Sequence, residues 1–266
     1  MIKLVLISLT LLLAGCSGMV SAPSQIESAP RVQPGPMRED LATVPELDGP
    51  VITVGVYGFE DMTGQRAPAD NFANLSSAVT QGAEAWVIDA LLTAGNGTWF
   101  EVVERGGLDN LVRERQLIRS TRENYLTDAG DGEGGLDPLR FAGLLLEGGI
   151  VGYDSNVTTG GVGARYLGIG ATSQYRIDTV TIAMRIVSVS TGRVLASVAV
   201  EKSIASYRDS TDVFRFLDLG TRALETEAGY SVNEPTNYAV RSAIEAGVIE
   251  LIYQGERRGL WSFKEQ

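Results

Sequence analysis

The chain has 266 residues, of which 44% are hydrophobic, and it carries a formal net charge of −11. This is enough apolar material for the core of one large domain, whereas an acidic chain is a poor candidate for binding nucleic acid. With no histidine and only one cysteine, the composition excludes histidine-dependent catalysis, histidine-ligated metals and an internal disulfide. Since no phosphate-binding glycine motif occurs either, we expect no catalytic residue, no metal site and no cofactor, and the chain is not predicted to be an enzyme.

The first element along the chain is a signal sequence that ends at Cys16. A positive charge is followed by an apolar stretch, residues 4–13, that is too short to span a bilayer as a helix. A cysteine directly after Ala-Gly is typical of bacterial lipoproteins, in which the signal peptide, here residues 1–15, is removed and the cysteine receives acyl chains such as palmitate. The pattern predicts a lipid anchor on Cys16, with a plain secretory signal as the alternative. The Ser17 that follows favours the outer membrane over the inner one.

Residues 17–50 are rich in proline, serine, alanine and glycine and lack periodicity, which is typical of a linker. Together with the cysteine they are expected to form a lipidated N-terminal linker or arm over residues 16–50. Two interpretations stay open for this segment: a tether without specific contacts, and an arm that packs on a neighbour.

The folded body is predicted to begin at residue 51 and to mix strands with helices. Residues 51–155 should form its first part, with a long polar loop over residues 59–77. The expected strands cover residues 51–57, 99–103 and 146–153, and the expected helices cover residues 78–93, 108–115 and 138–145.

The second half of the body is predicted to be a hairpin and a helix. Residues 178–206 should hold two strands, 179–187 and 194–200, with a turn at Thr191-Gly192. Residues 232–266 should hold a helix over 238–255 and a tail. The mixture of elements indicates a compact α/β or α+β domain.

Two segments do not fit a domain core, residues 156–177 and 207–231. Each can hold two strands of roughly 9–11 residues, the length that crosses a bilayer when tilted. Apolar residues that alternate with polar ones, as in the second segment, are typical of a membrane β-barrel. The positions assigned to these two hairpins are Gly161, Val162, Ala164, Tyr166, Phe214, Phe216, Leu224 and Tyr230. Long soluble loops or exposed hairpins are an equally open alternative.

The two segments carry a structural consequence if they cross a membrane. Four strands cannot close a barrel in one chain, and an open sheet cannot lie in lipid because every lipid-facing backbone group must be paired. Several subunits would therefore each lend two β-hairpins to one shared oligomeric transmembrane barrel, and the protein would be a ring.

Short motifs in a fixed order across the mature chain cover both of these segments. They are Ser155-Asn156-Val157, Gly160 to Tyr166 with Gly168-Ile169-Gly170, Val189 to Gly192, Val213 to Phe216, Ser242 to Glu245, and Arg258 to Trp261. The ordered set resembles the curli-type amyloid secretion channel lipoproteins, the CsgG family.

The resemblance implies a nine-fold ring in the outer membrane, with one large barrel above a periplasmic α/β domain. Unfolded amyloid subunits would leave the periplasm through the pore by diffusion, without nucleotide hydrolysis. The implied partners are a periplasmic cap protein and a surface-side assembly factor. The protein would be lipid-anchored on the periplasmic side of the outer membrane and would span that membrane as an oligomeric barrel.

The resemblance also implies a pore constriction built from one loop per subunit, here near residues 60–76. A tyrosine, an asparagine and a phenylalanine line the constriction in the family, and Asn71 and Phe72 match the last two. The tyrosine position holds Ala67 or is displaced by a length change, and the pair Asn74-Leu75 leaves the register open. Alanine in place of the tyrosine should widen one layer of the constriction.

Two other functions stay open from the same sequence. A periplasm-facing envelope-assembly lipoprotein that binds partners but forms no pore would need the same anchor and the same body. A carboxylate-based hydrolase could use Glu101, Glu104, Asp109 or Glu114. Carboxylates in helices and at strand ends are more often solvated surface charges. The two hairpin segments distinguish the channel from the lipoprotein without a pore.

Overall fold

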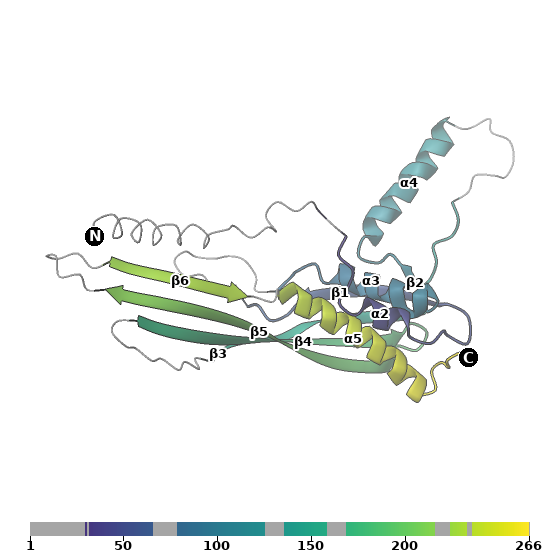
Figure 1. The fold of residues 1–266 in the computed structure, drawn as a ribbon. Helices are drawn as coiled ribbons and strands as arrows, with labels where there is room; N and C mark the ends of the chain where they lie inside the picture. Colours follow the sequence, from purple (N-terminus) through teal and green to yellow (C-terminus); the bar gives the residue numbers. More distant parts are fainter. Residues whose placement is uncertain are drawn as a thin grey trace, which may run out of the picture. The chain divides into compact units, whose positions relative to one another are not determined.

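The computed structural model describes residue 30 and residues 32–65, 79–125, 136–158, 169–215, 224–232 and 236–265 (Figure 1). The chain divides into two units, Met1–Pro34 and Gly35–Gln266, and the second unit holds every helix and strand named below. Its combination of one sheet with several helices confirms the mixed α+β class expected from the sequence.

A six-stranded sheet in the order β2-β1-β3-β4-β5-β6 forms the framework of the second unit. Its strands are β1 (Ile52–Asp61), β2 (Phe100–Val103), β3 (Leu144–Thr158), β4 (Ile169–Ser188), β5 (Val194–Arg215) and β6 (Leu224–Val232). β1 runs parallel to its two neighbours, β2 and β3, whereas the pairs from β3 to β6 are all antiparallel. Parallel neighbours need a long crossover connection, and the connection from β1 to β2 contains a helix.

Helices cover one face of this sheet, namely α3 (Glu84–Thr93) with the 3₁₀ turn η2 (Ala94–Gly97), the short α2 (Arg38–Ala42) and α5 (Thr236–Arg257). A further helix, α4 (Leu108–Tyr125), projects away from the sheet (Figure 1). α5 packs along β4 and β5 and also contacts α3 and α2 (Figure 1). At Gly247 the helix approaches the sheet so closely that a Cβ would lie 2.8 Å from the Met184 Cε. The core therefore lies between the sheet and α5.

β4 shows why these residues form a sheet with one buried face. Val180, Ile182 and Met184 are at most 1% exposed, whereas Arg185 is exposed. Side chains alternate between the two faces of a strand, so this period of two buries one row against α5. Burial of such a side chain stabilises the fold by about 1.5–3 kcal/mol. α5 contributes a matching row at helical spacing, which includes Val240, Ala243, Ile244, Val248, Leu251 and Ile252.

A cluster of aromatic rings joins the segment before β1 to the C-terminal tail. The Trp99 ring centroid lies 5.7 Å from that of Trp261 and 5.9 Å from that of Phe263. The Trp99 Nε1–H donates to the Pro45 carbonyl at 2.7 Å. The Trp261 Nε1–H donates to the Ile252 carbonyl of α5 at 2.8 Å. Each of the two indole N–H groups thus has a hydrogen-bond partner, and the tail is fixed to two distant parts of the chain.

The structure corrects two expectations about helices. Residues 138–145 are not a helix, because Leu144 and the residues after it pair with β1 as the start of β3. A short apolar run does not distinguish a helix from a buried strand. The helix expected over 78–93 begins only at Glu84. Before it, the Gly82 N–H donates to the Thr80 hydroxyl at 3.2 Å, a local turn that competes with a helix.

Residues 38–50 contain structure that the linker interpretation does not include. They form α2, whose Leu41 is 1% exposed, and Val44 after it is 4% exposed. The backbone of Leu47 forms a β-bridge with Phe263 of the tail. Composition alone did not indicate these contacts, because they depend on residues more than two hundred positions away.

We expect Gly255→Ala to destabilise the folded unit. A Cβ at residue 255 would lie 2.0 Å from the Trp261 Cζ2, and such overpacking costs about 1–3 kcal/mol. Urea unfolding should therefore show a lower midpoint for this variant than for the unchanged chain. The loss should shrink in the double variant with Trp261→Leu, since the ring is then absent. Strictly additive losses would contradict the proposed contact.

Candidate functional site: long strands, an open sheet face and a buried carboxylate

The structure describes part of the sites predicted from the sequence. Phe214 lies in β5, and Leu224 and Tyr230 lie in β6. The other predicted residues lie outside the described residues, namely Cys16, Ala67, Asn71, Phe72, Gly161, Val162, Ala164, Tyr166 and Phe216. The roles given to all of these residues stay predictions.

The central antiparallel pair of the sheet is unusually long. β4 has 20 residues and β5 has 22, whereas strands in globular proteins usually have roughly 3–10. Their pairing runs from Ile186 opposite Ala196 to Ile169 opposite Val213 without a register shift. The predicted hairpin over 178–206 and the strands next to it therefore belong to one continuous hydrogen-bonded ladder.

The side chains whose burial is described lie at one end of this ladder. On β4 and β5 the described buried residues reach as far as Asp178 and Ile204. Beyond them β4 continues to Ile169, and β5 continues to Arg215 and pairs with the 9-residue β6. This distal part of the sheet contains the strands that the sequence predicts to cross a membrane.

The register between β5 and β6 is defined along the whole of β6. Phe214 lies opposite Glu225, and Arg215 lies opposite Leu224. In this register the alternating apolar positions of the two strands are offset by one residue. Directly opposite residues share a face of the sheet, so this register places Phe214 and Leu224 on opposite faces, and they cannot both face lipid.

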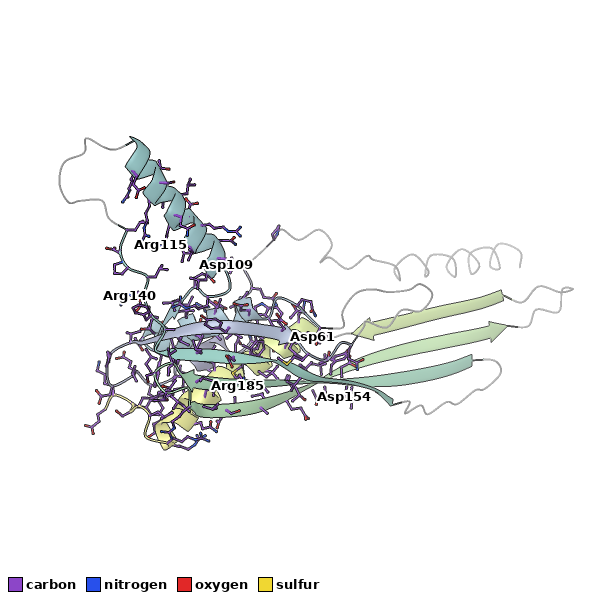
Figure 2. All side chains as sticks on the ribbon, turned by 180° about the vertical axis from the view of Figure 1, so that it is seen from behind. Asp61, Asp109, Arg115, Arg140, Asp154 and Arg185 are labelled. Carbon is purple, nitrogen blue, oxygen red and sulfur yellow. The ribbon has the colours of Figure 1, made fainter. Side chains whose placement is uncertain are left out.

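The face of the sheet opposite α5 carries a groove of about 420 Å³. Tyr57 and Val151, which are 45% and 46% exposed, contribute to its lining. Beside them Arg185 of β4 (Figure 2) pairs with Glu147 of β3, with 2.8 Å between Nη2 and Oε2. Because both partners are partly exposed, the ion pair adds little stability. Exposed apolar residues around a groove are typical of a surface that contacts another protein.

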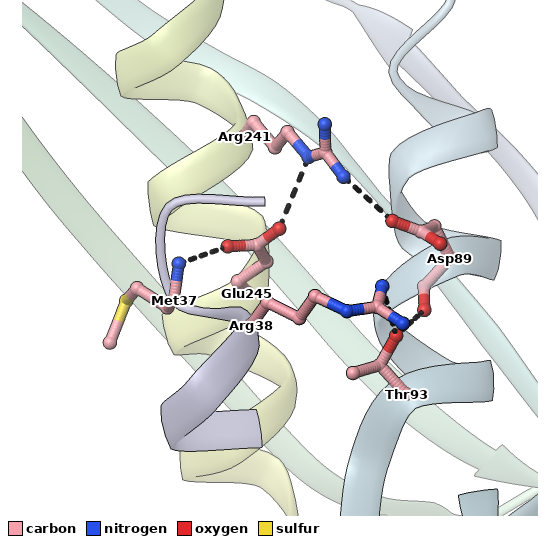
Figure 3. Close-up of polar contacts among 6 residues, drawn as sticks. All are labelled: Met37, Arg38, Asp89, Thr93, Arg241 and Glu245. Atoms are coloured by element: carbon pink, nitrogen blue, oxygen red, sulfur yellow. Dashed lines mark hydrogen bonds and ion pairs between the residues drawn. The ribbon is translucent and has the colours of Figure 1, made fainter. Parts of the chain in front are cut away.

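On the face that α5 covers, Glu245 is a buried carboxylate whose two oxygen atoms both have partners (Figure 3). Oε2 accepts the Met37 N–H at 2.6 Å, and Oε1 accepts the Arg241 Nε–H at 3.1 Å. Arg241 also donates from Nη2 to Asp89 Oδ2 of α3 at 2.7 Å. The cluster thus links α5, α3 and the segment before α2 through charged groups.

Burial raises the pKa of the Glu245 carboxyl above its usual value. The Met37 N–H and the Arg241 guanidinium favour the ionised form and oppose this rise. Sequence reasoning did not single out Glu245 as functional. The one local signal was its spacing from Arg241, which places the two side chains one turn apart on a helix. The other partners come from distant parts of the chain.

In the part of the chain that the structure describes, no three or more His, Cys, Asp or Glu side chains are grouped so as to hold a metal ion. None of the helices described has both the length and the apolar content that crossing a membrane requires. Every described buried side-chain nitrogen or oxygen has a hydrogen-bond partner.

The chain is similar to proteins of one name over nearly its whole length. It is 43% identical over 265 residues to the Curli production assembly/transport component CsgG of Salmonella typhimurium. The alignment covers 99% of this chain and 92% of that protein. The protein of the same name from Escherichia coli (strain K12) is also 43% identical over 265 residues, with the same coverage of 99% and 92%.

Solved structures give a weaker likeness. A PelC dodecamer from Paraburkholderia phytofirmans matches with a TM-score of 0.26 and 10% sequence identity, over 80% of this chain and 94% of that chain. This similarity is too low to bear on assembly. The family model described as Curli production assembly/transport component CsgG matches residues 39–266. With this match and the relatives at 43% identity, the chain belongs to the CsgG family.

Proposed function

We propose that the chain is an outer-membrane lipoprotein that assembles with copies of itself into a channel for unfolded curli-type amyloid subunits. The observation that carries the proposal is the continuous ladder from β3 to β6, in which β4 and β5 have 20 and 22 residues. Membership of the CsgG family and the names of the relatives support a role in curli secretion. Transport from the periplasm to the cell surface would occur by diffusion, without nucleotide hydrolysis.

Assembly into a ring follows from the edges of the sheet. The sheet is open, and in its distal part, where β1 no longer pairs with β3, its two edges are β3 and β6. An open edge cannot lie in hydrocarbon, because its backbone N–H and C=O groups lose water without gaining partners. Strands from a neighbouring copy would supply the missing hydrogen bonds, and repetition of this pairing around an axis closes a barrel. The family resemblance gives nine as the expected number of subunits.

The groove on the open face of the sheet supports contact between copies. Tyr57 and Val151 are nearly half exposed there and lie on a rigid framework of paired strands. A second copy that covered this face would remove apolar surface from water, which is worth about 25 cal/mol per Å². The periplasmic bodies would then pack together below the shared barrel.

Selection for unfolded chains would come from the constriction loop. A ring of Asn71 amides would hydrate the backbone of a passing chain, and a ring of Phe72 phenyl groups would contact its side chains only briefly. An extended chain could pass such an opening and a folded one could not. Ala67, in place of the family's tyrosine, would make one layer of the opening wider.

The anchor and the partners complete the proposal. Acyl chains on Cys16 would hold each subunit at the periplasmic face of the outer membrane until enough copies gather to close the barrel. The expected partners are the unfolded amyloid subunits, a periplasmic cap protein and a surface-side assembly factor.

Ring formation and conductance test the channel directly. Electron micrographs of the detergent-extracted full chain should show rings with a central hole, and the preparation should conduct ions across planar bilayers. Deletion of residues 207–230 removes the distal part of β5 and most of β6, so both properties should be lost while the body keeps a cooperative thermal transition. Conductance that survives the deletion would refute the channel. Intact micelle-bound protein without rings would favour the envelope-assembly lipoprotein that forms no pore.

Phe72→Ala should raise the single-channel current, because a smaller side chain widens the opening. Leu75→Ala is the matched control, since it belongs to the second asparagine–apolar pair of the same loop. Its current should equal that of the unchanged channel. An increase in Leu75→Ala with no change in Phe72→Ala would instead place the other pair at the constriction.

Cys16→Ala, secreted with an ordinary signal peptide, should stay soluble in the periplasm. Without acyl chains the monomers are no longer concentrated at the bilayer, and stable insertion should fail. Fractionation of membranes, with a full-length lipidated sample as the control, measures this. Normal assembly of the variant in the outer membrane would contradict the proposed role of the anchor.

A further inference from the structure

The helix α4 projects away from the sheet, and no other described helix or strand packs along it (Figure 1). None of its side chains whose burial is described is buried, and Leu117 is 58% exposed. Near its middle, Arg115 donates from Nη2 to the Asp137 carbonyl of the segment before β3. Helices in proteins owe most of their stability to tertiary packing of one face. The described part of one copy does not supply that packing to this 18-residue helix.

One face of α4 combines apolar and positively charged side chains. Positions three or four apart lie on the same side of a helix. This spacing brings together Leu108, Leu111, Val112, Arg115, Ile118, Arg119 and Arg122. Arg113 and Leu117 lie on the opposite face. The combined face, called here the arginine face, is suited to an apolar surface that carries carboxylates.

The sheet lacks a layer on the face that carries the groove. β1 runs parallel to β2 and β3, and parallel strands are usually covered on both faces, with nearly continuous apolar runs in their sequences. Such runs occur in β3, at residues 144–146 and 150–151. The helices that pack on the sheet, α2, α3 and α5, all lie on the other face. On the groove side Tyr57 and Val151 are nearly half exposed.

The lining of the groove is complementary to the arginine face. Met62 and Val151 offer apolar surface, and Glu60 and Glu147 bring two carboxylates against the one guanidinium of Arg185. Because Glu147 already pairs with Arg185, the exposed Glu60 is the carboxylate available to an arginine from outside. The lengths also agree, since α4 is about 27 Å long and three neighbouring strands occupy about 10–15 Å.

We propose that α4 of one copy lies across the open sheet face of the next copy, with its arginine face in the groove. The contact rests on the self-assembly proposed above and names the element that makes it. α4 points away from the sheet of its own copy in both views (Figures 1 and 2). Since α4 and the groove are different surfaces, each copy gives a helix to one neighbour and receives a helix from the other. Such head-to-tail contacts close into a ring when their rotation closes.

Cross-linking of the detergent-extracted full chain tests the contact. Val112→Cys together with Val151→Cys places one thiol on the arginine face and one in the groove, both at exposed positions. A short bifunctional maleimide should then join copies into dimers, trimers and larger products on a denaturing gel. Val112→Cys with Leu92→Cys is the matched control, because Leu92 of α3 is 53% exposed on the face that helices cover. It should give only the background of the unchanged chain, whose one cysteine is Cys16.

Two other results of this experiment would overturn the proposal. Products no larger than the dimer would exclude a head-to-tail contact. Thiols that are consumed without an increase in mass would show that α4 folds onto the sheet of its own copy.

Reversal of single charges tests the arginine face without new thiols. Arg119→Glu should weaken assembly about tenfold or more, measured by sedimentation over a range of concentrations, because it puts a carboxylate against Glu60. Arg113→Glu is the matched control, since it makes the same charge change at an exposed position on the opposite face. It should leave assembly unchanged. Glu60→Arg should restore part of the loss in Arg119→Glu. Equal weakening by Arg119→Glu and Arg113→Glu would overturn the proposal.

Electron micrographs and conductance of the same samples separate this contact from the channel. Rings with a central hole in which the thiols at residues 112 and 151 do not cross-link would refute the α4 contact and support the channel. Cross-linked products larger than the dimer, from a preparation that does not conduct, would refute the channel and support the α4 contact.

Discussion

The backbone ladder between β4 and β5 is the interaction on which the rest of this structure depends. At one end its register is fixed by the core, because a slip of one residue would turn Val180, Ile182 and Met184 away from α5. No register shift separates that end from the distal pairs near Ile169. The packing against α5 at that end therefore determines the alignment of the two strands along the rest of the ladder. A hairpin that is not joined to such a core would have nothing to fix the register of its strands.

α5 stabilises the fold through its apolar contact with the sheet, and it also positions a cluster of charged groups around Glu245. Its apolar row supplies most of its stabilising contact with the sheet, since burial of such side chains dominates the folding free energy. The cluster around Glu245 contributes differently, because a buried ion pair gains little net stability after desolvation. What it provides is a defined arrangement: an oxygen directed at the Met37 N–H and a guanidinium that bridges to Asp89. The helix thus packs the core and positions the entry of the chain.

Hydrophobic periodicity in the sequence predicted the helices and strands that bury one regular row of side chains. The final helix was expected over 238–255 and is found over Thr236–Arg257, and the strands in β1, β2 and β4 lie where apolar runs or alternation placed them. The start of β3 at Leu144 was missed, because it depends on parallel pairing with β1. The contacts of Glu245 with Met37 and of Arg241 with Asp89 were missed because each joins residues far apart in the sequence. The length of β4 was underestimated because glycines blur the alternation that precedes it.

The aromatic cluster around Trp99 has a consequence for the order in which the protein is made and folded. In the proposed pathway the chain would be secreted with its N-terminus first, so Cys16 would meet lipidating enzymes long before Trp261 and Phe263 had crossed the inner membrane. Until those last rings arrive, Trp99 lacks two of its aromatic neighbours and the core has an open side. In that pathway the body would close only when translocation is nearly complete. In the proposed pathway the chain is first tethered and only then completes its fold.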